Sequence, residues 1–328
     1  MIDWSTVAGN AVRAAFGPEA AVYALAAIGL NLHYGYTGLL NFGQVGFMLV
    51  GAYGVAISVA TWGLSMWLGI VIGVAAAVVL ALVLGIPTLR LRADYFAITT
   101  IAAAEILRLL VRSSALADVT GGVFGLQRIA GPFFDINPIP RGRYGIGVLK
   151  YTNTQLWTLL VTWALVVLAT ILVALLVRSP WGRALRSVRD DEDVARSLGK
   201  NAFAYKMQSL VLGGVFGALA GAMFAIGPQA VNADSFAPQV TFFAYTILIL
   251  GGAATRFGPI VGAWIFWFIV SGVDSFLREA RDADLLPNFL GSAVGATSIA
   301  LVGLGLVVLL VFRPQGIFGS RREMRLDV

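Results

Sequence analysis

The sequence predicts an all-α, polytopic integral membrane protein. Of its 328 residues, 59% are hydrophobic and only 12% are charged, and the mean hydropathy is +0.85. Such a chain has too few polar residues to cover a soluble globule of its size. Its apolar runs have roughly the length that crosses a hydrocarbon core of about 30 Å. We therefore expect about nine transmembrane helices, within a range of eight to ten, in one transmembrane domain over residues 1–328.

The expected elements follow the chain in order. Residues 3–16 are expected to form a surface helix before the first span. The first and seventh runs are short or interrupted by glycine, which predicts broken or re-entrant segments. The 38 glycines suit close helix packing in a membrane, because small residues let backbones approach. The nine apolar runs lie at about 20–34, 44–61, 64–85, 94–112, 154–178, 206–227, 240–255, 258–277 and 287–312.

The residue inventory excludes several classes of chemistry. With no cysteine and a single histidine, disulfides, a catalytic thiol and a cysteine- or histidine-built metal site are excluded. No phosphate-binding loop, zinc-protease motif or nucleophile elbow occurs, so we expect no catalytic residues, no bound cofactor and no metal. The start of the chain lacks the layout of a signal peptide, so the first apolar segment is expected to be retained.

The stretch from Arg178 to Lys206 is densely charged and lies between two long apolar runs. Ser179 followed by Pro180 has the form of a helix N-cap and first helical residue. Apolar side chains then recur at i, i+4 and i+7, which predicts a short amphipathic helix built on Trp181, Leu185 and Val188. We interpret residues 179–204 as a cytoplasmic loop that binds another protein.

A second short helix is expected within the same loop. Asp190 is its expected N-cap, and Gly199 stands where a helix ends in a left-handed residue. Asn201 is expected to cap the helix that follows. The apolar residues of this second helix are Val194, Ala195 and Leu198. The alternative for the acidic run that begins at Asp190 is helix capping alone.

The positions of Lys and Arg predict the orientation. If residues 178–206 are cytoplasmic, nine spans place the N-terminus outside and the C-terminus in the cytoplasm, and most of the 23 basic residues then fall on the cytoplasmic side. The net charge of +6 is thus explained by membrane topology, and no nucleic-acid partner is expected. Residues 113–153 become the largest external loop, which either meets an external partner or serves as a connector.

A polar cluster interrupts the early apolar sequence at NLHYGYTGLLNFGQVGF. Because unsatisfied polar groups are costly in lipid, such a break must face protein or a water-filled path. One interpretation is a broken helix that lines a translocation pathway, and the other is a polar turn at the membrane surface. The candidate pathway residues in this cluster are Asn31, His33, Asn41 and Gln44.

The expected fourth span carries two ionisable residues at membrane depth. Glu105 and Arg108 stand at i, i+3 on one helical face and can pair. They are candidate pathway residues, with an internal ion pair that fixes helix packing as the alternative. Asp234 lies after the sixth span, where it either touches a delivered substrate or a binding partner, or caps the next helix.

Five stretches carry a resemblance to a known family: residues 35–56, 89–110, 120–126, 179–225 and 312–319. They resemble the LivM-type permease subunits of branched-chain amino acid ABC importers, a group that also includes urea-importer permeases. In ABC importer permeases a cytoplasmic coupling helix with an EAA-x3-G pattern enters a cleft on the ATPase. Residues 193–199 are similar to that pattern but depart from it at the first two positions. The resemblance implies an ATPase-docking set of Trp181, Leu185, Asp193, Val194, Ala195, Leu198 and Gly199.

The resemblance implies a single transmembrane permease domain in the bacterial inner membrane that imports branched-chain or related amino acids by alternating access. It also implies separate partners: cytoplasmic ATP-binding-cassette ATPases that bind the ATP, a second permease subunit in a heterodimer, an external substrate-binding protein and membrane lipids. A stand-alone channel or secondary transporter for a small polar solute, a urea or amide permease, and an intramembrane enzyme built on His33 are the alternatives. The chain itself is expected not to be an enzyme.

Overall fold

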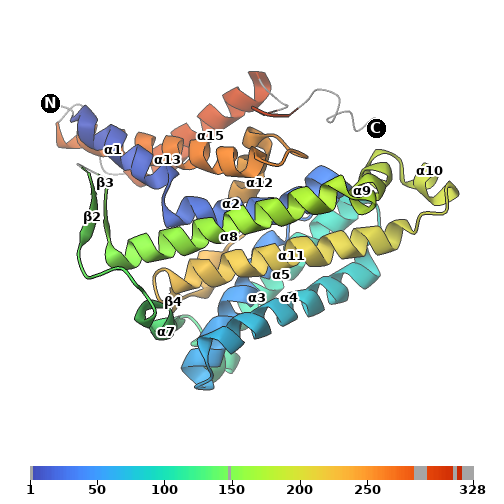
Figure 1. The fold of residues 1–328 in the computed structure, drawn as a ribbon, viewed down its shortest axis with the longest axis horizontal. Helices are drawn as coiled ribbons and strands as arrows, with labels where there is room; N and C mark the ends of the chain where they lie inside the picture. Colours follow the sequence, from blue (N-terminus) through green and yellow to red (C-terminus); the bar gives the residue numbers. More distant parts are fainter. Residues whose placement is uncertain (1–2, 147–148, 284–293, 313–315, 320–328) are drawn as a thin grey trace.

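The computed structural model describes residues 3–146, 149–283, 294–312 and 316–319, and the fold is a bundle of long helices (Figure 1). Two segments of π-helix and two of 3-10 helix join these helices, at Asn31–Tyr36, Ile57–Thr61, Ser114–Leu116 and Ala233–Phe236. The α-helices are α1 (Trp4–Ala15), α2 (Pro18–Leu30), α3 (Gln44–Ala56), α4 (Met66–Thr88), α5 (Ala93–Arg112), α6 (Ala117–Thr120), α7 (Gly131–Asp135), α8 (Asn153–Arg178), α9 (Pro180–Asp190), α10 (Glu192–Ser197), α11 (Ala202–Ile226), α12 (Gln239–Gly251), α13 (Gly258–Asp282) and α15 (Val294–Phe312).

The helical, polytopic fold class is confirmed, whereas the count of nine spans is not. Six helical segments of the described chain are long and apolar enough to cross a membrane, and α12 is a shorter apolar helix. The first of the six runs from Trp4 to Tyr36 and unites the expected surface helix with the expected first span. The expected fourth span, now α5, is not among them. Part of the expected ninth span, residues 287–293, lies outside the described residues.

Short strands form two antiparallel pairs. β1 (Leu126–Gln127) pairs with β4 (Ala230–Val231), and β2 (Arg143–Ile146) pairs with β3 (Leu149–Thr152). The expected external loop at 113–153 therefore holds short helices and a β-hairpin. Its position next to the first turn of α8 places it at the end of that helix opposite to α9 and α10 (Figure 1).

Helix α2 lies at the centre of the bundle. All of its residues from 20 to 30 are buried, and α8, α11, α12 and α13 pack around it. Its sequence explains this position, because alanine and glycine on every face let neighbouring helices approach from all sides. A helix that is apolar all round and has no polar stripe is the type expected in a core.

Helices α3 and α11 pack with their backbones in contact, and small residues make this possible. A Cβ atom added to Gly221 would lie 1.8 Å from the carbonyl oxygen of Met48. The glycines of α11 at 213, 217 and 221 recur every fourth residue, which places them on one face. This spacing is the small-residue pattern that supports close helix crossing in membranes.

The caps around α9 and α10 agree in part with expectation. Ser179 caps α9, and its hydroxyl accepts a hydrogen bond from the backbone of Trp181 at 3.2 Å. Gly199 has φ +75°, and Asn201 caps α11. The prediction of Asp190 as the second cap was wrong. Asp190 is the last residue of α9, and Asp191, in an extended conformation, caps α10.

Candidate functional site

The polar break after α2 folds into a buried network around His33. The Nε2 group of His33 donates to the carbonyl oxygen of Leu210 at 3.2 Å, since a carbonyl can only accept. Its Nδ1 atom then accepts from the side-chain amide of Asn41 at 3.0 Å. Gln44 donates to the carbonyl oxygen of Gly213 at 3.2 Å. These bonds assign a neutral imidazole that joins the break to α11.

Asn31 connects the same break to the turn between α12 and α13. Its side-chain amide donates to the carbonyl oxygen of Thr255 at 2.7 Å, and its Oδ1 accepts from the backbone of Ala254 at 2.8 Å. Asn31, His33, Asn41 and Gln44 are each at most 2% exposed. The structure brings these four predicted residues together, packed against protein, and none of them lines the cavity described below. Their pathway role stays a prediction.

Arg189 joins α9 to the end of the broken helix. Its side chain is 10% exposed, and its Nη1 group donates to the carbonyl oxygen of Gly35 at 2.7 Å. The last carbonyls of a helix have no partner within the helix, and a cation satisfies both their hydrogen bonds and the helix dipole. Arg189 also pairs with the carboxylate of Asp190 at 3.0 Å. A movement of α9 would therefore displace the end of the helix that begins with α2.

Replacing Arg189 with alanine is expected to lower the free energy of unfolding by about 1.5–3 kcal/mol, because a buried hydrogen bond to a charged donor is lost. The thermal midpoint of the detergent-solubilised protein measures this change. Arg183→Ala is the matched control, since Arg183 lies exposed on the same helix. Equal midpoints for the two variants would contradict the role given to Arg189.

Glu105 and Arg108 on α5 form the predicted ion pair, and Asp234 joins it. The guanidinium of Arg108 contacts the carboxylate of Glu105 at 2.6 Å and that of Asp234 at 2.8 Å. Arg112 contacts Asp234 as well, at 3.1 Å. The cluster ties α5 to the 3-10 helix Ala233–Phe236. The prediction that Asp234 caps the next helix was wrong, because it lies within the 3-10 helix that Asn232 caps.

The predicted docking residues divide between two sides of the charged loop. Leu185 is fully buried and Trp181 donates to the side chain of Gln208 at 2.7 Å, so both belong to the attachment of α9 to the bundle. Ala195 is 1% exposed and packs with Val188, Ala202 and Tyr205. Asp193, Val194, Leu198 and Gly199 remain exposed on α10 and at its end.

The outward side of α10 presents apolar side chains to solvent. Val194 is 54% exposed and Leu198 is 74% exposed. Val194 lies on α10 and Leu198 is its C-cap residue, and their i, i+4 spacing places them on the same side. We call Val194 and Leu198 the α10 face. Charged residues neighbour them on this loop, so the α10 face is an exposed apolar patch in a polar setting.

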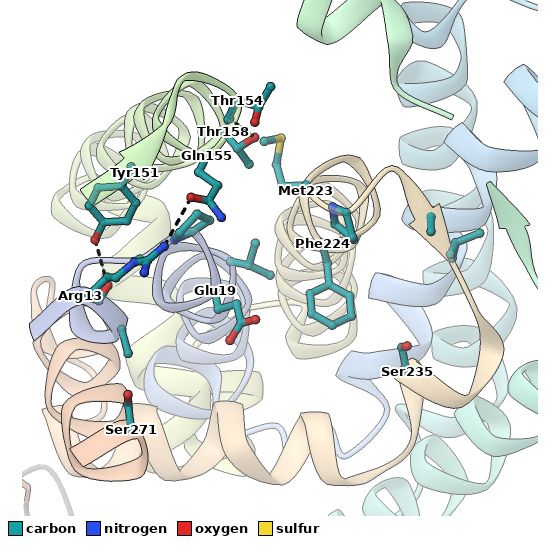
Figure 2. Close-up of a pocket in the computed structure, with 18 of the residues that line it drawn as sticks. Arg13, Glu19, Tyr151, Thr154, Gln155, Thr158, Met223, Phe224, Ser235 and Ser271 are labelled. Carbon is teal, nitrogen blue, oxygen red and sulfur yellow. Dashed lines mark hydrogen bonds between the residues drawn. The ribbon is translucent and has the colours of Figure 1, made fainter. Parts of the chain in front are cut away.

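A cavity of about 610 Å³ opens at the other end of the long helices (Figure 2). The first turn of α8 and the last turn of α11 line it, together with parts of α1, α2, α13 and the segment 228–236. Its charged residues are Arg13 and Glu19. Arg13 lies over the ring of Tyr151, 5.2 Å from its centre, and burial raises the pKa of the Tyr151 hydroxyl.

Arg13 and Glu19 are not among the site residues predicted from the sequence. A signal was present, because Glu19 opens a long apolar run and ionisable residues within membrane segments are rare and often functional. Arg13 belongs to the expected surface helix, and only the fold of α1 against α13 brings it to the cavity.

Known proteins match nearly the whole chain. The family model for the permease component of branched-chain amino acid transport systems matches residues 18–312. The high-affinity branched-chain amino acid transport system permease protein LivM of Escherichia coli strain K12 is 31% identical over 311 residues, covering 92% of this chain and 68% of that protein. A probable LivM permease protein of Methanocaldococcus jannaschii is 24% identical, with coverage of 92% and 91%.

Among solved structures, PsaBC from Streptococcus pneumoniae in complex with Fab aligns with 92% of this chain and 91% of that chain. The identity is 15% and the TM-score is 0.45, a likeness too weak to support an inference.

Proposed function

This chain belongs to the family of permease components of branched-chain amino acid transport systems, and from that premise we propose that it is the membrane-spanning subunit of an ATP-driven importer. The proposed substrates are branched-chain or closely related amino acids. The chain carries no nucleotide-binding motif, so ATP is hydrolysed by separate ATPase subunits. A second permease subunit and an external binding protein complete the proposed assembly.

The exposed α10 face is the single observation on which the proposal of an ATPase partner rests. Covering the exposed Leu and Val side chains of this charged loop with another protein removes apolar surface from water, and this burial stabilises the complex. The loop leads directly into α11, which packs against α2, α3 and α4 in the bundle. A partner that moves α10 would thus act on the transmembrane core through one continuous segment.

Arg189 offers a second connection from the loop to the core. In the proposed cycle, closure of the ATPases displaces α10 and α9, and Arg189 carries this displacement to the carbonyl oxygen of Gly35. The end of the α2 helix then shifts against α11 and α12, and the path opens on the other side. Rigid movements of this kind are how packed helices switch between two arrangements.

The proposed orientation places the α10 face in the cytoplasm. The cavity, α1 and the β2–β3 hairpin then lie toward the outside, because they surround the other end of α8 (Figure 1). Residues 317 and 318 donate to the carbonyl oxygens of Leu250 and Gly251 at the end of α12. That contact supports a cytoplasmic C-terminus, since the turn after α12 binds Asn31 near Arg189 and the docking loop.

Purification and reconstitution test the proposal. An affinity-tagged chain should co-purify with an ATPase and a second permease subunit, and the assembly in liposomes should take up leucine only with ATP and the external binding protein. Uptake by this chain alone in ATP-free liposomes would instead establish a channel or secondary transporter. Uptake of urea but not of leucine would replace the substrate class.

A further inference from the structure

The cavity between α1, α2, α8 and α11 contains one acidic and one basic side chain that do not pair with each other. The side chain of Glu19 is exposed and lines the cavity, and it takes part in none of the ion pairs or side-chain hydrogen bonds between described residues (Figure 2). Arg13 is held by neutral groups: its Nη2 donates to the side chain of Gln155 at 3.4 Å, and its guanidinium lies over Tyr151. Among the described residues, neither charge therefore has an oppositely charged partner.

Other walls of the cavity are apolar. Val22, Met223 and Phe236 are each at most 5% exposed and belong to the core beneath it, and Phe224 lies against Phe236 with ring centres 5.6 Å apart. A volume of about 610 Å³ falls within the range of about 300–1,000 Å³ that is typical of small-molecule sites. Mostly apolar walls with a few well-placed polar groups are also typical of such sites.

We propose that this cavity is a binding site for an amino-acid zwitterion. The carboxylate of Glu19 receives the ligand's ammonium group, the guanidinium of Arg13 receives its carboxylate, and Phe224 and Met223 contact its apolar side chain. A simple cation would leave Arg13 without a counterion, and a simple anion would do the same for Glu19. A neutral lipid tail would leave both charges unsatisfied, which is costly in a confined site.

The proposal rests on the proposed function for its choice of leucine-like ligands. Under the proposed orientation the cavity lies at the external end of the helices, where a substrate delivered from outside arrives first. The cavity also contacts α2, whose far end is bonded to Arg189 through the π-helix. A ligand bound here therefore rests against the helix on which the docking loop acts.

Binding of three probes to the complex of permease subunits and ATPases in lipid nanodiscs, prepared without the external binding protein, tests the site, with dissociation constants from ligand-observed NMR titration. The probes are L-leucine, L-leucinamide, which lacks the carboxylate, and 4-methylpentanoate, which lacks the ammonium. We expect wild-type protein to bind leucine about tenfold or more tightly than either analogue, because each analogue loses one charge-assisted hydrogen bond.

Variants that remove one charge identify which residue binds the ammonium group of the ligand and which binds its carboxylate. Glu19→Gln should weaken leucine binding about tenfold or more and remove the preference for leucine over 4-methylpentanoate. Arg13→Gln should remove the preference for leucine over leucinamide, and Arg13→Lys should keep part of it. Asp118→Asn is the matched control, because Asp118 is an exposed carboxylate on α6 that does not line the cavity. It should bind all probes as wild type does.

The outcomes separate this site from the proposed function. If the wild-type assembly takes up leucine with ATP but Glu19→Gln binds the probes as wild type does, the site is wrong and the function stands. If leucine binds in a Glu19-dependent way but is not taken up, the site stands and the function is wrong. Equal affinity of wild-type protein for all three probes would show a non-selective apolar cavity and overturn the site.

Discussion

Replacing both Val194 and Leu198 with aspartate is expected to abolish co-purification of the ATPase and ATP-dependent uptake. Hot-spot residues near the centre of a protein interface cost about 2 kcal/mol or more each when they are truncated, so the loss of two such contacts weakens the complex about a thousandfold. Aspartate also adds charges that would be desolvated at the contact. Because both side chains are exposed, one on α10 and one at its end, the permease itself should remain folded in the membrane.

Two further variants make this experiment decisive. Phe124→Asp is the matched control, since Phe124 is 90% exposed but lies in the loop before β1, at the other end of the bundle. It should leave ATPase binding unchanged. Ala195→Asp should behave differently from both, because Ala195 is buried and its replacement disrupts the loop. Undiminished ATPase binding by the Val194 and Leu198 double variant would remove the docking role from the α10 face.

Replacing Gly221 with leucine is expected to prevent the stable folding of the bundle. A Cβ atom at this position would lie 1.8 Å from the carbonyl oxygen of Met48, and that atom belongs to the backbone of α3. A backbone cannot rotate away as a flexible side chain can, so α3 and α11 must separate. We expect a loss of about 3 kcal/mol or more, at the upper end for overpacked cores.

Fluorescence-detected size-exclusion chromatography of the tagged protein measures the effect as a loss of the monodisperse peak and a lower thermal midpoint. Gly303→Leu is the control, because a Cβ atom added to Gly303 in α15 meets nothing within 4 Å. It should elute as wild type does. A normal peak for Gly221→Leu would mean that α3 and α11 are not packed as the structure describes.

Local sequence signals predicted the charged loop well. Ser179 and Pro180 start α9, Gly199 adopts the left-handed conformation after α10, and Asn201 caps α11. These features depend on a few neighbouring residues, so they are readable from the sequence. The error at Asp190 has the same origin, because two adjacent aspartates offer equal caps and only the backbone direction selects Asp191.

Side-chain roles were less predictable. Helical spacing groups Val194, Ala195 and Leu198 as one apolar set, yet Ala195 faces the bundle while the other two face outward. The sequence shows that the polar cluster at 31–44 contains hydrogen-bond donors and acceptors. Their partners on α11 and in the turn after α12 lie far away in sequence. Sequence spacing within one helix carries no information on such partners.

The sequence by itself determined the membrane-spanning helical class, the separate charged loop and the absence of a nucleotide-binding motif, because composition and local motifs fix each of these. Only the tertiary structure decided that α2 is the central helix, that Arg189 binds the carbonyl oxygen of Gly35, and that Arg13 and Glu19 line one cavity. The physical reason is that these features arise where helices distant in sequence meet. Many helix arrangements would satisfy the same hydropathy, and close packing of small residues together with pairing of buried polar groups selects this one.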